Sequence, residues 1–82
     1  MSVSTHVLDS VLGRPAAGIA VRLLAGDELL AEGVTDADGR CRLTEQATAA
    51  ADHRLVFATR PWFEAQGRET FYPEVVLAFA VR

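Results

Sequence analysis

Short runs in which every second residue is hydrophobic recur along this chain, and turn-forming residues separate them. In residues 19–25, Ile19, Val21 and Leu23 share one face, and Leu55 and Phe57 repeat this spacing further on. Alternation with a period of two is typical of a β-strand that buries one face. It predicts strands at residues 5–9, 19–25, 28–34, 40–43, 53–59 and 71–82. Short strands that follow one another every ~8–12 residues favour an antiparallel β-sandwich.

The first predicted strand carries a histidine near its start. Val7 and Asp9 lie on one face of this strand, and His6 and Leu8 lie on the other. Gly13-Arg14-Pro15 then ends the extended stretch, because glycine permits a positive φ and proline lacks a backbone donor. A sheet in this position would hold the imidazole of His6 rigidly.

Three other segments have distinct local signals. In residues 35–39 (TDADG) the aspartates can bond their own backbone and the glycine permits a positive φ, which predicts a tight turn. Residues 61–67 predict a short helix, since a proline opens the segment and a glycine closes it. Its Trp62 and Phe63 are expected to plug the sandwich. Residues 44–52 (TEQATAAAD) are compatible with a loop or one helical turn.

Composition limits the classes of protein to which the chain can belong. Its 82 residues predict one domain, residues 1–82, and a hydrophobic share of 50% predicts a folded chain. A net charge of −3 without a basic stripe argues against a nucleic-acid partner. No apolar run approaches ~18 residues, which argues against a membrane. Cys41 is the only cysteine, so we expect no intrachain disulfide or thiolate metal site, and a cytoplasmic protein.

Five segments in register resemble one protein family. They are STHVLD, GRPAAG, TDADGRC, WFEAQGRE and FYPEV. Their order and spacing resemble the transthyretin-related 5-hydroxyisourate hydrolases over nearly the whole chain. The resemblance implies an all-β, transthyretin-like (immunoglobulin-like, prealbumin) antiparallel β-sandwich with one short helix. It also implies a homo-oligomer, a dimer or tetramer with the site at a subunit interface, and no metal or organic cofactor.

The activity that the resemblance implies is hydrolysis of a ring amide of 5-hydroxyisourate, a step of purine (urate) degradation. The family's members continue with two more strands, a His-Tyr-His-Val-Pro-Leu-like segment and a terminal Tyr-Arg-Gly-Ser. The sequence is therefore expected to represent this fold truncated after its sixth strand. His6 and Arg40 are the two family site positions that it retains.

His6 and Arg40 are thus the candidate catalytic residues, and each has a simpler interpretation. His6 could be a general base that activates water, or a polar side chain at a sheet margin. The forked donors of Arg40 could hold a planar, oxygen-rich anion and stabilise an oxyanion, or Arg40 could be a solvated residue after a turn. The resemblance favours the site interpretation for both residues.

Other polar or aromatic residues receive structural interpretations. Asp9 could support a site, but we favour a role in closing the end of its strand. We expect His53 at the surface and Tyr72-Pro73 in the core rather than at the rim of a site. Cys41 has no sequence neighbour that would make it a nucleophile, so thiol catalysis is not proposed.

Three classes of function remain open at this stage. The chain could be a 5-hydroxyisourate-hydrolase-like enzyme, a non-catalytic binding or scaffold module, or a related enzyme repurposed for another heterocyclic substrate. In the family fold, the strand holding His6 pairs with one that would follow Arg82. Residues 4–11 should therefore have an unpaired edge, and residues 71–82 are apolar on both faces. Both features favour a homo-oligomer.

Overall fold

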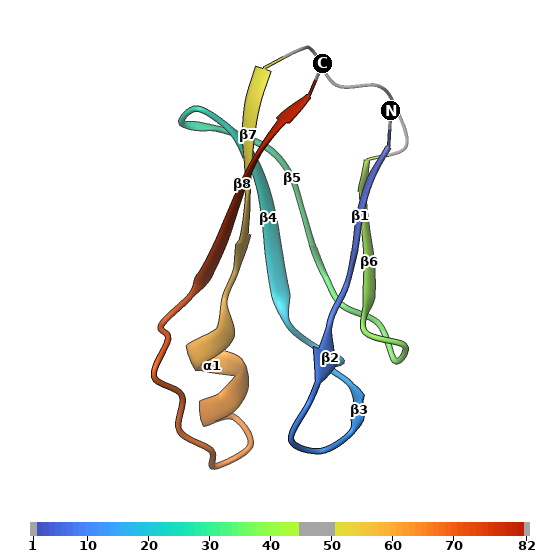
Figure 1. Cartoon of the computed structure of the whole chain (residues 1–82), viewed down its shortest axis with the longest axis vertical. Coiled ribbons are helices and arrows are strands. Elements are labelled where there is room, and N and C mark those ends of the chain that lie inside the picture. The colour runs from blue at the N-terminus through green and yellow to red at the C-terminus, as the bar shows by residue number, and fades with distance from the viewer. Residues whose placement is uncertain (1, 45–50, 82) are drawn as a thin grey trace.

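A computed structural model describes residues 2–44 and 51–81 of the chain. Eight strands and one short helix lie within these ranges (Figure 1). The elements are β1 (Val3–His6), β2 (Leu8–Asp9), β3 (Arg14–Pro15), β4 (Ala20–Ala25), β5 (Glu28–Val34), β6 (Arg40–Thr44), β7 (Ala51–Phe57), α1 (Thr59–Glu64) and β8 (Val75–Val81).

The strands form two layers that face each other. The larger layer is an antiparallel sheet with the order β5-β4-β7-β8. In the second layer β1 pairs antiparallel with β6, and the short strands β2 and β3 pair with each other. Figure 1 shows β1 and β6 on one side of the molecule and the four-stranded sheet on the other, with α1 at the end where β2 and β3 lie.

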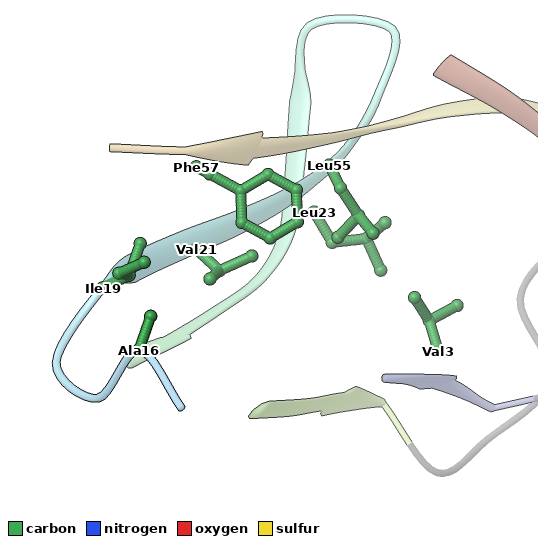
Figure 2. Packing of buried hydrophobic residues seen from close by; sticks show 7 residues of the cluster. All are labelled: Val3, Ala16, Ile19, Val21, Leu23, Leu55 and Phe57. Carbon is green, nitrogen blue, oxygen red and sulfur yellow. The ribbon is translucent and has the colours of Figure 1, made fainter. Parts of the chain in front are cut away.

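The hydrophobic core fills the space between these layers. Figure 2 shows side chains from β4 and β7 pointing toward the layer that contains β1. All members of the cluster are buried, and they are Val3, Ala16, Ile19, Val21, Leu23, Leu55 and Phe57. Ile19, Val21, Leu23, Leu55 and Phe57 are the residues whose spacing predicted a buried strand face, so that prediction is confirmed. The alternation therefore selects the inner face of both central strands.

The predicted strand ends agree best in the middle of the chain. The predictions for residues 19–25, 28–34, 40–43 and 53–59 correspond to β4, β5, β6 and β7, with ends shifted by two residues or fewer. Residues 45–50, which belong to the segment predicted as loop or helical turn, lie outside the described residues. The described ends of this segment, Thr44, Ala51 and Asp52, belong to β6 and β7, so the prediction is wrong for these three residues.

The prediction of one continuous strand over residues 5–9 is wrong, because the structure has two strands there, β1 and β2. They are separated by Val7, whose N–H donates to the Gly39 carbonyl (2.8 Å) and whose carbonyl accepts from the N–H of Ala16 (2.9 Å). The backbone therefore changes partners at this residue, from β6 to the segment that includes β3. Arg14 and Pro15 do not simply end the strand, since they pair back onto β2.

The last predicted strand begins too early. β8 starts at Val75, and Phe71 and Tyr72 precede it as exposed residues. Tyr72 is 62% exposed, so the expectation that Tyr72-Pro73 packs in the core is wrong. Pro73 has no N–H to offer to a neighbouring strand, which explains why pairing with β7 begins only after it.

The predicted helix is present but shifted toward the N-terminus. α1 occupies Thr59–Glu64 rather than residues 61–67. Pro61 lies in its first turn, where a missing N–H costs little. Gly67 has a φ of +66°, and the N–H of the next residue, Arg68, donates to the Phe63 carbonyl, so the glycine does end the helical segment.

The aromatic residues of α1 cover one end of the sandwich. Trp62 packs against the hydrophobic core, and its Nε1–H donates to the Ala17 carbonyl at 2.6 Å. Phe63 is half-buried and lies under the Arg68 guanidinium, 4.7 Å from the centroid of its ring. The interpretation of Trp62 as a plug is therefore supported. Phe63 is not among the residues that pack against the core cluster; its ring contacts Trp62 edge-on and Arg68.

His53 was expected at the surface, and this prediction is wrong. Its side chain is 1% exposed. β7 begins at Ala51 instead of residue 53, and His53 continues the inward face of Leu55 and Phe57. Its Nδ1 lies 2.9 Å from the Ala51 carbonyl oxygen, and its ring stacks on Phe79 of β8.

Asp9 closes the end of the extended segment, as favoured from the sequence. Its Oδ1 accepts from the N–H groups of Val11 and Leu12, and its Oδ2 accepts from Arg68 at 2.7 Å. The hydrogen bond from Arg68, followed by that from Leu12, holds the pKa of Asp9 below its ordinary value. Asp9 thus links the turn after β2 to the segment that follows α1.

β1 has an edge without a strand partner in the described part of the chain. Its described pairing is with β6 only. This agrees with the expectation of an unpaired edge along the strand that holds His6. Among the described residues, no helix is long and apolar enough to cross a membrane.

Replacement of Gly39 should destabilise the protein far more than replacement of Gly13. Both glycines have a positive φ, +79° and +67°, so an alanine at either position has an unfavourable backbone conformation, which costs about 1–2 kcal/mol. A Cβ at residue 39 would also collide with the carbonyl oxygen of Val7, whereas a Cβ at residue 13 meets nothing within 4 Å.

Gly39→Ala should therefore lose a further ~1–3 kcal/mol of unfolding free energy relative to Gly13→Ala. Urea denaturation of both variants measures the difference. Equal losses in the two variants would contradict the close approach of residue 39 to β1.

The Asp9–Arg68 ion pair should contribute a pH-dependent part of the stability. Because the pKa of Asp9 is lowered by folding, this contribution is fully present above the unfolded value of about 3.9. It is lost as the pH falls from there through the folded pKa. Asp9→Asn should have a flatter dependence of unfolding free energy on pH below about 4 than the parent.

Asp38→Asn is the matched control, because no hydrogen bond or ion pair of the Asp38 carboxylate is found with the described residues. Denaturant titrations between about pH 3 and 7 compare the three proteins. An unchanged acid slope in Asp9→Asn would remove this ion pair as a source of pH dependence.

Candidate functional site

The pairing of β1 with β6 places His6 directly across from Arg40. In this antiparallel ladder, His6 is the Cα partner of Arg40 and Ser4 is the partner of Arg42. Residues that face each other in a ladder have their side chains on the same face of the sheet. The two candidate residues predicted from the sequence are therefore brought together by backbone register.

This shared face points away from the core. Cys41, which alternates with Arg40 and Arg42 along β6, is buried, and its ladder partner Thr5 is half-buried. Side chains on neighbouring strand positions point in opposite directions. His6 and Arg40 are both exposed, so they belong to the outer face of the second layer.

A cavity of about 740 Å³ lies over this face. It is an open concavity, and among the described residues its walls are Ser4, Thr5, His6, Asp36, Arg40, Cys41 and Arg42. Its volume is in the range of sites for small molecules. His6 also borders a second, mainly apolar groove of about 270 Å³, which reaches Phe57, Val75 and Leu77.

Asp36 fixes the backbone at the start of β6. Its Oδ1 accepts from the N–H of Arg40 at 3.0 Å and from the N–H of Asp38 at 2.9 Å. Its own N–H donates to the carbonyl of Arg40 at 2.8 Å. The turn at residues 35–39 therefore delivers Arg40 to the sheet in one defined backbone conformation.

The same turn also fixes the backbone next to His6. The carbonyl of Gly39 accepts from the N–H of Val7, the residue that follows His6. Gly39 is buried, and the absence of a side chain lets it approach the Val7 carbonyl. One turn thus controls the relative position of both candidate residues.

The charges around the cavity favour an anionic or oxygen-rich ligand. Among the described residues, Arg40, Arg42 and Asp36 are the charged residues that line its wall. The Arg40 side chain makes no hydrogen bond or ion pair with the described residues, so its donors are available to a ligand. In the described ranges, no group of three or more His, Cys, Asp or Glu residues could hold a metal ion.

Cys41 borders the cavity but is poorly suited to act as a nucleophile. Burial raises the pKa of its thiol, and the nearby Asp36 carboxylate raises it further. A higher pKa leaves less thiolate near neutral pH. Thiol catalysis by Cys41 is therefore disfavoured by the structure as well as by the sequence.

Sequence reasoning missed some of the residues around the cavity. Ser4 and Arg42 lie two positions from His6 and Arg40, so strand alternation alone could have placed them on the same face. Asp36 was recognised only as part of a turn. Among the residues described, those that line this cavity do not include Asp9 or His53.

Comparisons with known proteins extend over most of the chain. A 5-hydroxyisourate hydrolase of Salmonella typhimurium is 38% identical over 96% of this chain, which spans 62% of that relative's length. The solved structure of Klebsiella pneumoniae 5-hydroxyisourate hydrolase superimposes with a TM-score of 0.95 at 34% identity, covering 99% of this chain and 80% of that one. Sea bream transthyretin in complex with thyroxine has a TM-score of 0.88 at 29% identity and covers 96% of this chain and 73% of its own.

These similarities confirm the transthyretin-like antiparallel sandwich that was predicted from the sequence motifs. A family model described as the HIUase/Transthyretin family matches residues 3–82. That range includes β1, β6 and the turn between β5 and β6, which together build the His6–Arg40 cavity. The chain belongs to the HIUase/transthyretin family.

Proposed function

We propose that this chain acts as a 5-hydroxyisourate-hydrolase-like enzyme that opens a cyclic amide by hydrolysis in urate degradation. The observation that carries the proposal is the register of β1 and β6, which sets His6 opposite Arg40 on the wall of one cavity. The relatives and the solved structure that bear the name 5-hydroxyisourate hydrolase support the choice of substrate.

In this reaction His6 is the general base. Its neutral imidazole takes a proton from a water molecule, whose oxygen attacks the carbonyl carbon of the ring amide. The C–N bond of the resulting tetrahedral species then breaks, and the departing nitrogen receives the proton from the imidazolium. No metal, cofactor or additional oxidant is needed for this sequence of steps.

Arg40 stabilises the negative charge that develops on the amide oxygen. Its guanidinium presents two parallel donors to a planar group that is rich in oxygen atoms. Arg42 adds positive charge to the same wall of the cavity. Asp36 contributes indirectly, because its hydrogen bond to the backbone N–H of Arg40 keeps that residue at the start of β6.

A second candidate function is binding without catalysis. It is favoured by the similarity to sea bream transthyretin, which was solved in complex with thyroxine. Among the described residues that line the proposed site, His6 is the one histidine. Saturable binding of 5-hydroxyisourate without turnover would favour this function, and turnover of a different heterocycle would favour a repurposed enzyme.

We further propose that residues 1–82 form one transthyretin-like domain and that it works in the cytoplasm. The two layers share one hydrophobic cluster, which supports a single domain. The free, buried thiol of Cys41 is consistent with a reducing compartment.

The same proposal includes a homo-oligomer with the site near the interface. β1 has an edge without a strand partner among the described residues, and such edges can pair with another chain. Next to it lies the apolar groove that reaches Val75 and Leu77, and Leu77 is 53% exposed. Burial of this groove by a second copy would cover exposed apolar surface beside His6.

His6→Ala should lower the rate of 5-hydroxyisourate hydrolysis by about 10²–10⁴-fold, because the general base is removed. Decay of freshly generated substrate is followed by ultraviolet absorbance. Added imidazole should restore part of the rate in His6→Ala, which separates loss of the base from misfolding. Absence of turnover in the parent protein would reject the enzymatic proposal, and full turnover in His6→Ala would remove His6 from the mechanism.

Arg40→Lys should lower the same rate by between about 10- and 10³-fold, since an ammonium group cannot form the two-pronged contact. Arg22→Lys on β4 is the control, because Arg22 is exposed and is not among the described residues that line the cavity. The control should keep the parent rate. Equal rates in Arg40→Lys and Arg22→Lys would assign Arg40 to the solvated surface.

Light scattering at micromolar concentration should give a mass of at least a dimer. Leu77→Arg should lower this mass, because it places a charge in the groove beside β1, whereas Val76→Arg, on the opposite face of β8, is the matched control. A stable monomer in the parent would contradict the oligomer proposal. A mass lowered only by Val76→Arg would move the interface to the other face of β8.

A further inference from the structure

Another cavity opens to solvent between the two layers, at the end of the sandwich farthest from α1. Its volume is about 300 Å³. It lies between β4, β5, β6 and β7, and most of its described walls are aliphatic, with Leu23 and Ala25 from β4, Leu30 and Ala31 from β5, and Leu43 from β6. It shares no described residue with the His6–Arg40 cavity. Any ligand that it takes is therefore separate from the proposed substrate.

Among the described residues that line this cavity, His53 is polar and buried, with 1% of its surface exposed. One nitrogen of its ring, Nδ1, lies 2.9 Å from the carbonyl oxygen of Ala51. One face of the ring stacks on Phe79, with 5.7 Å between the ring centroids. The other nitrogen, Nε2, has no hydrogen-bond partner among the described residues.

The chemistry of this nitrogen follows from its partner at the other position. A carbonyl oxygen only accepts hydrogen bonds, so in the neutral ring Nδ1 carries the hydrogen. Nε2 is then an acceptor with no hydrogen. A buried acceptor that lacks a partner is unfavourable, and a ligand with an N–H or O–H donor would satisfy it.

We propose that this cavity binds a small, neutral, mostly apolar molecule that donates one hydrogen bond to Nε2 of His53. An engineered apolar cavity of roughly 150 Å³ holds benzene, so a space of this volume accepts a fused two-ring molecule. Glu28 also lines the cavity, and its negative charge disfavours an anion. An aromatic N–H compound or a phenol has the required combination of apolar body and single donor.

Indole and indene are matched probes for this proposal, because they have nearly the same shape and only indole has an N–H donor. Both are titrated into the parent protein, and binding is followed by the amide and imidazole resonances in ¹⁵N NMR spectra. Indole should bind about 2- to 10-fold more tightly than indene, the range expected for one neutral hydrogen bond. The Nε2 resonance of His53 should move with indole and not with indene.

Two variants locate the binding. His53→Phe keeps an aromatic ring but removes the acceptor, so indole should lose its advantage over indene. Ala25→Leu fills the cavity beside His53, its ladder partner, and should weaken both probes. His6→Ala should bind indole like the parent, because His6 lies in the other cavity, so failure of the proposed hydrolase activity leaves this test intact.

The proposal is overturned if indole does not bind the parent, or if it binds without moving the Nε2 resonance of His53. It is also overturned if Ala25→Leu retains the parent affinity. The parent spectrum and Ala25→Leu decide the question even where His53→Phe does not fold.

Discussion

The contact between Gly39 and Val7 is the constraint on which the candidate site depends. The N–H of Val7 donates to the carbonyl of Gly39, and a side chain at residue 39 would collide with the carbonyl of Val7. Because the two backbones approach this closely at one point, β1 and β6 have one register next to it. That register sets His6 opposite Arg40, without a direct bond between the two side chains.

Thr35 connects this turn to the core on its other side. The buried hydroxyl of Thr35 donates to the Ala16 carbonyl at 2.7 Å and accepts from the N–H of Ile19 at 2.9 Å. Ala16 and Ile19 belong to the hydrophobic cluster. The turn at residues 35–39 is thus tied to the core by Thr35 and to β1 by Gly39, so packing of the sandwich and geometry of the site are coupled. A site on a two-stranded layer needs such support, since an isolated pair of strands is only marginally stable.

The sequence predicts the strands better than it predicts their partners. The inner faces of β4 and β7 follow from local alternation of Val21 with Leu23 and of Leu55 with Phe57. The opposition of His6 and Arg40 depends on a ladder between residues more than thirty positions apart, which no local pattern specifies. The family resemblance predicted that both residues belong to one site, but not that they pair. His53 was misplaced because the segment before it has few β-branched residues and gave no sign that β7 begins at Ala51. The change of pairing at Val7 was missed because it depends on backbone contacts to Gly39 and Ala16, which are distant in the sequence.

His6 and Arg40 are exposed to solvent, and this exposure affects both the proposed hydrolysis and the proposed assembly. Water is the nucleophile, so an open cavity supplies it, but the same water weakens the attraction between Arg40 and a developing oxyanion. The guanidinium is most effective when substrate and a covering surface displace solvent from around it. The described part of this chain provides the floor of the cavity, formed by β1, β6 and the Asp36 turn, and leaves the cavity open above. The groove beside His6 is apolar and adjoins the edge of β1, so a second copy seated there would bury apolar surface and exclude water from the site at once. On these physical grounds, association should raise the rate per site as well as the stability.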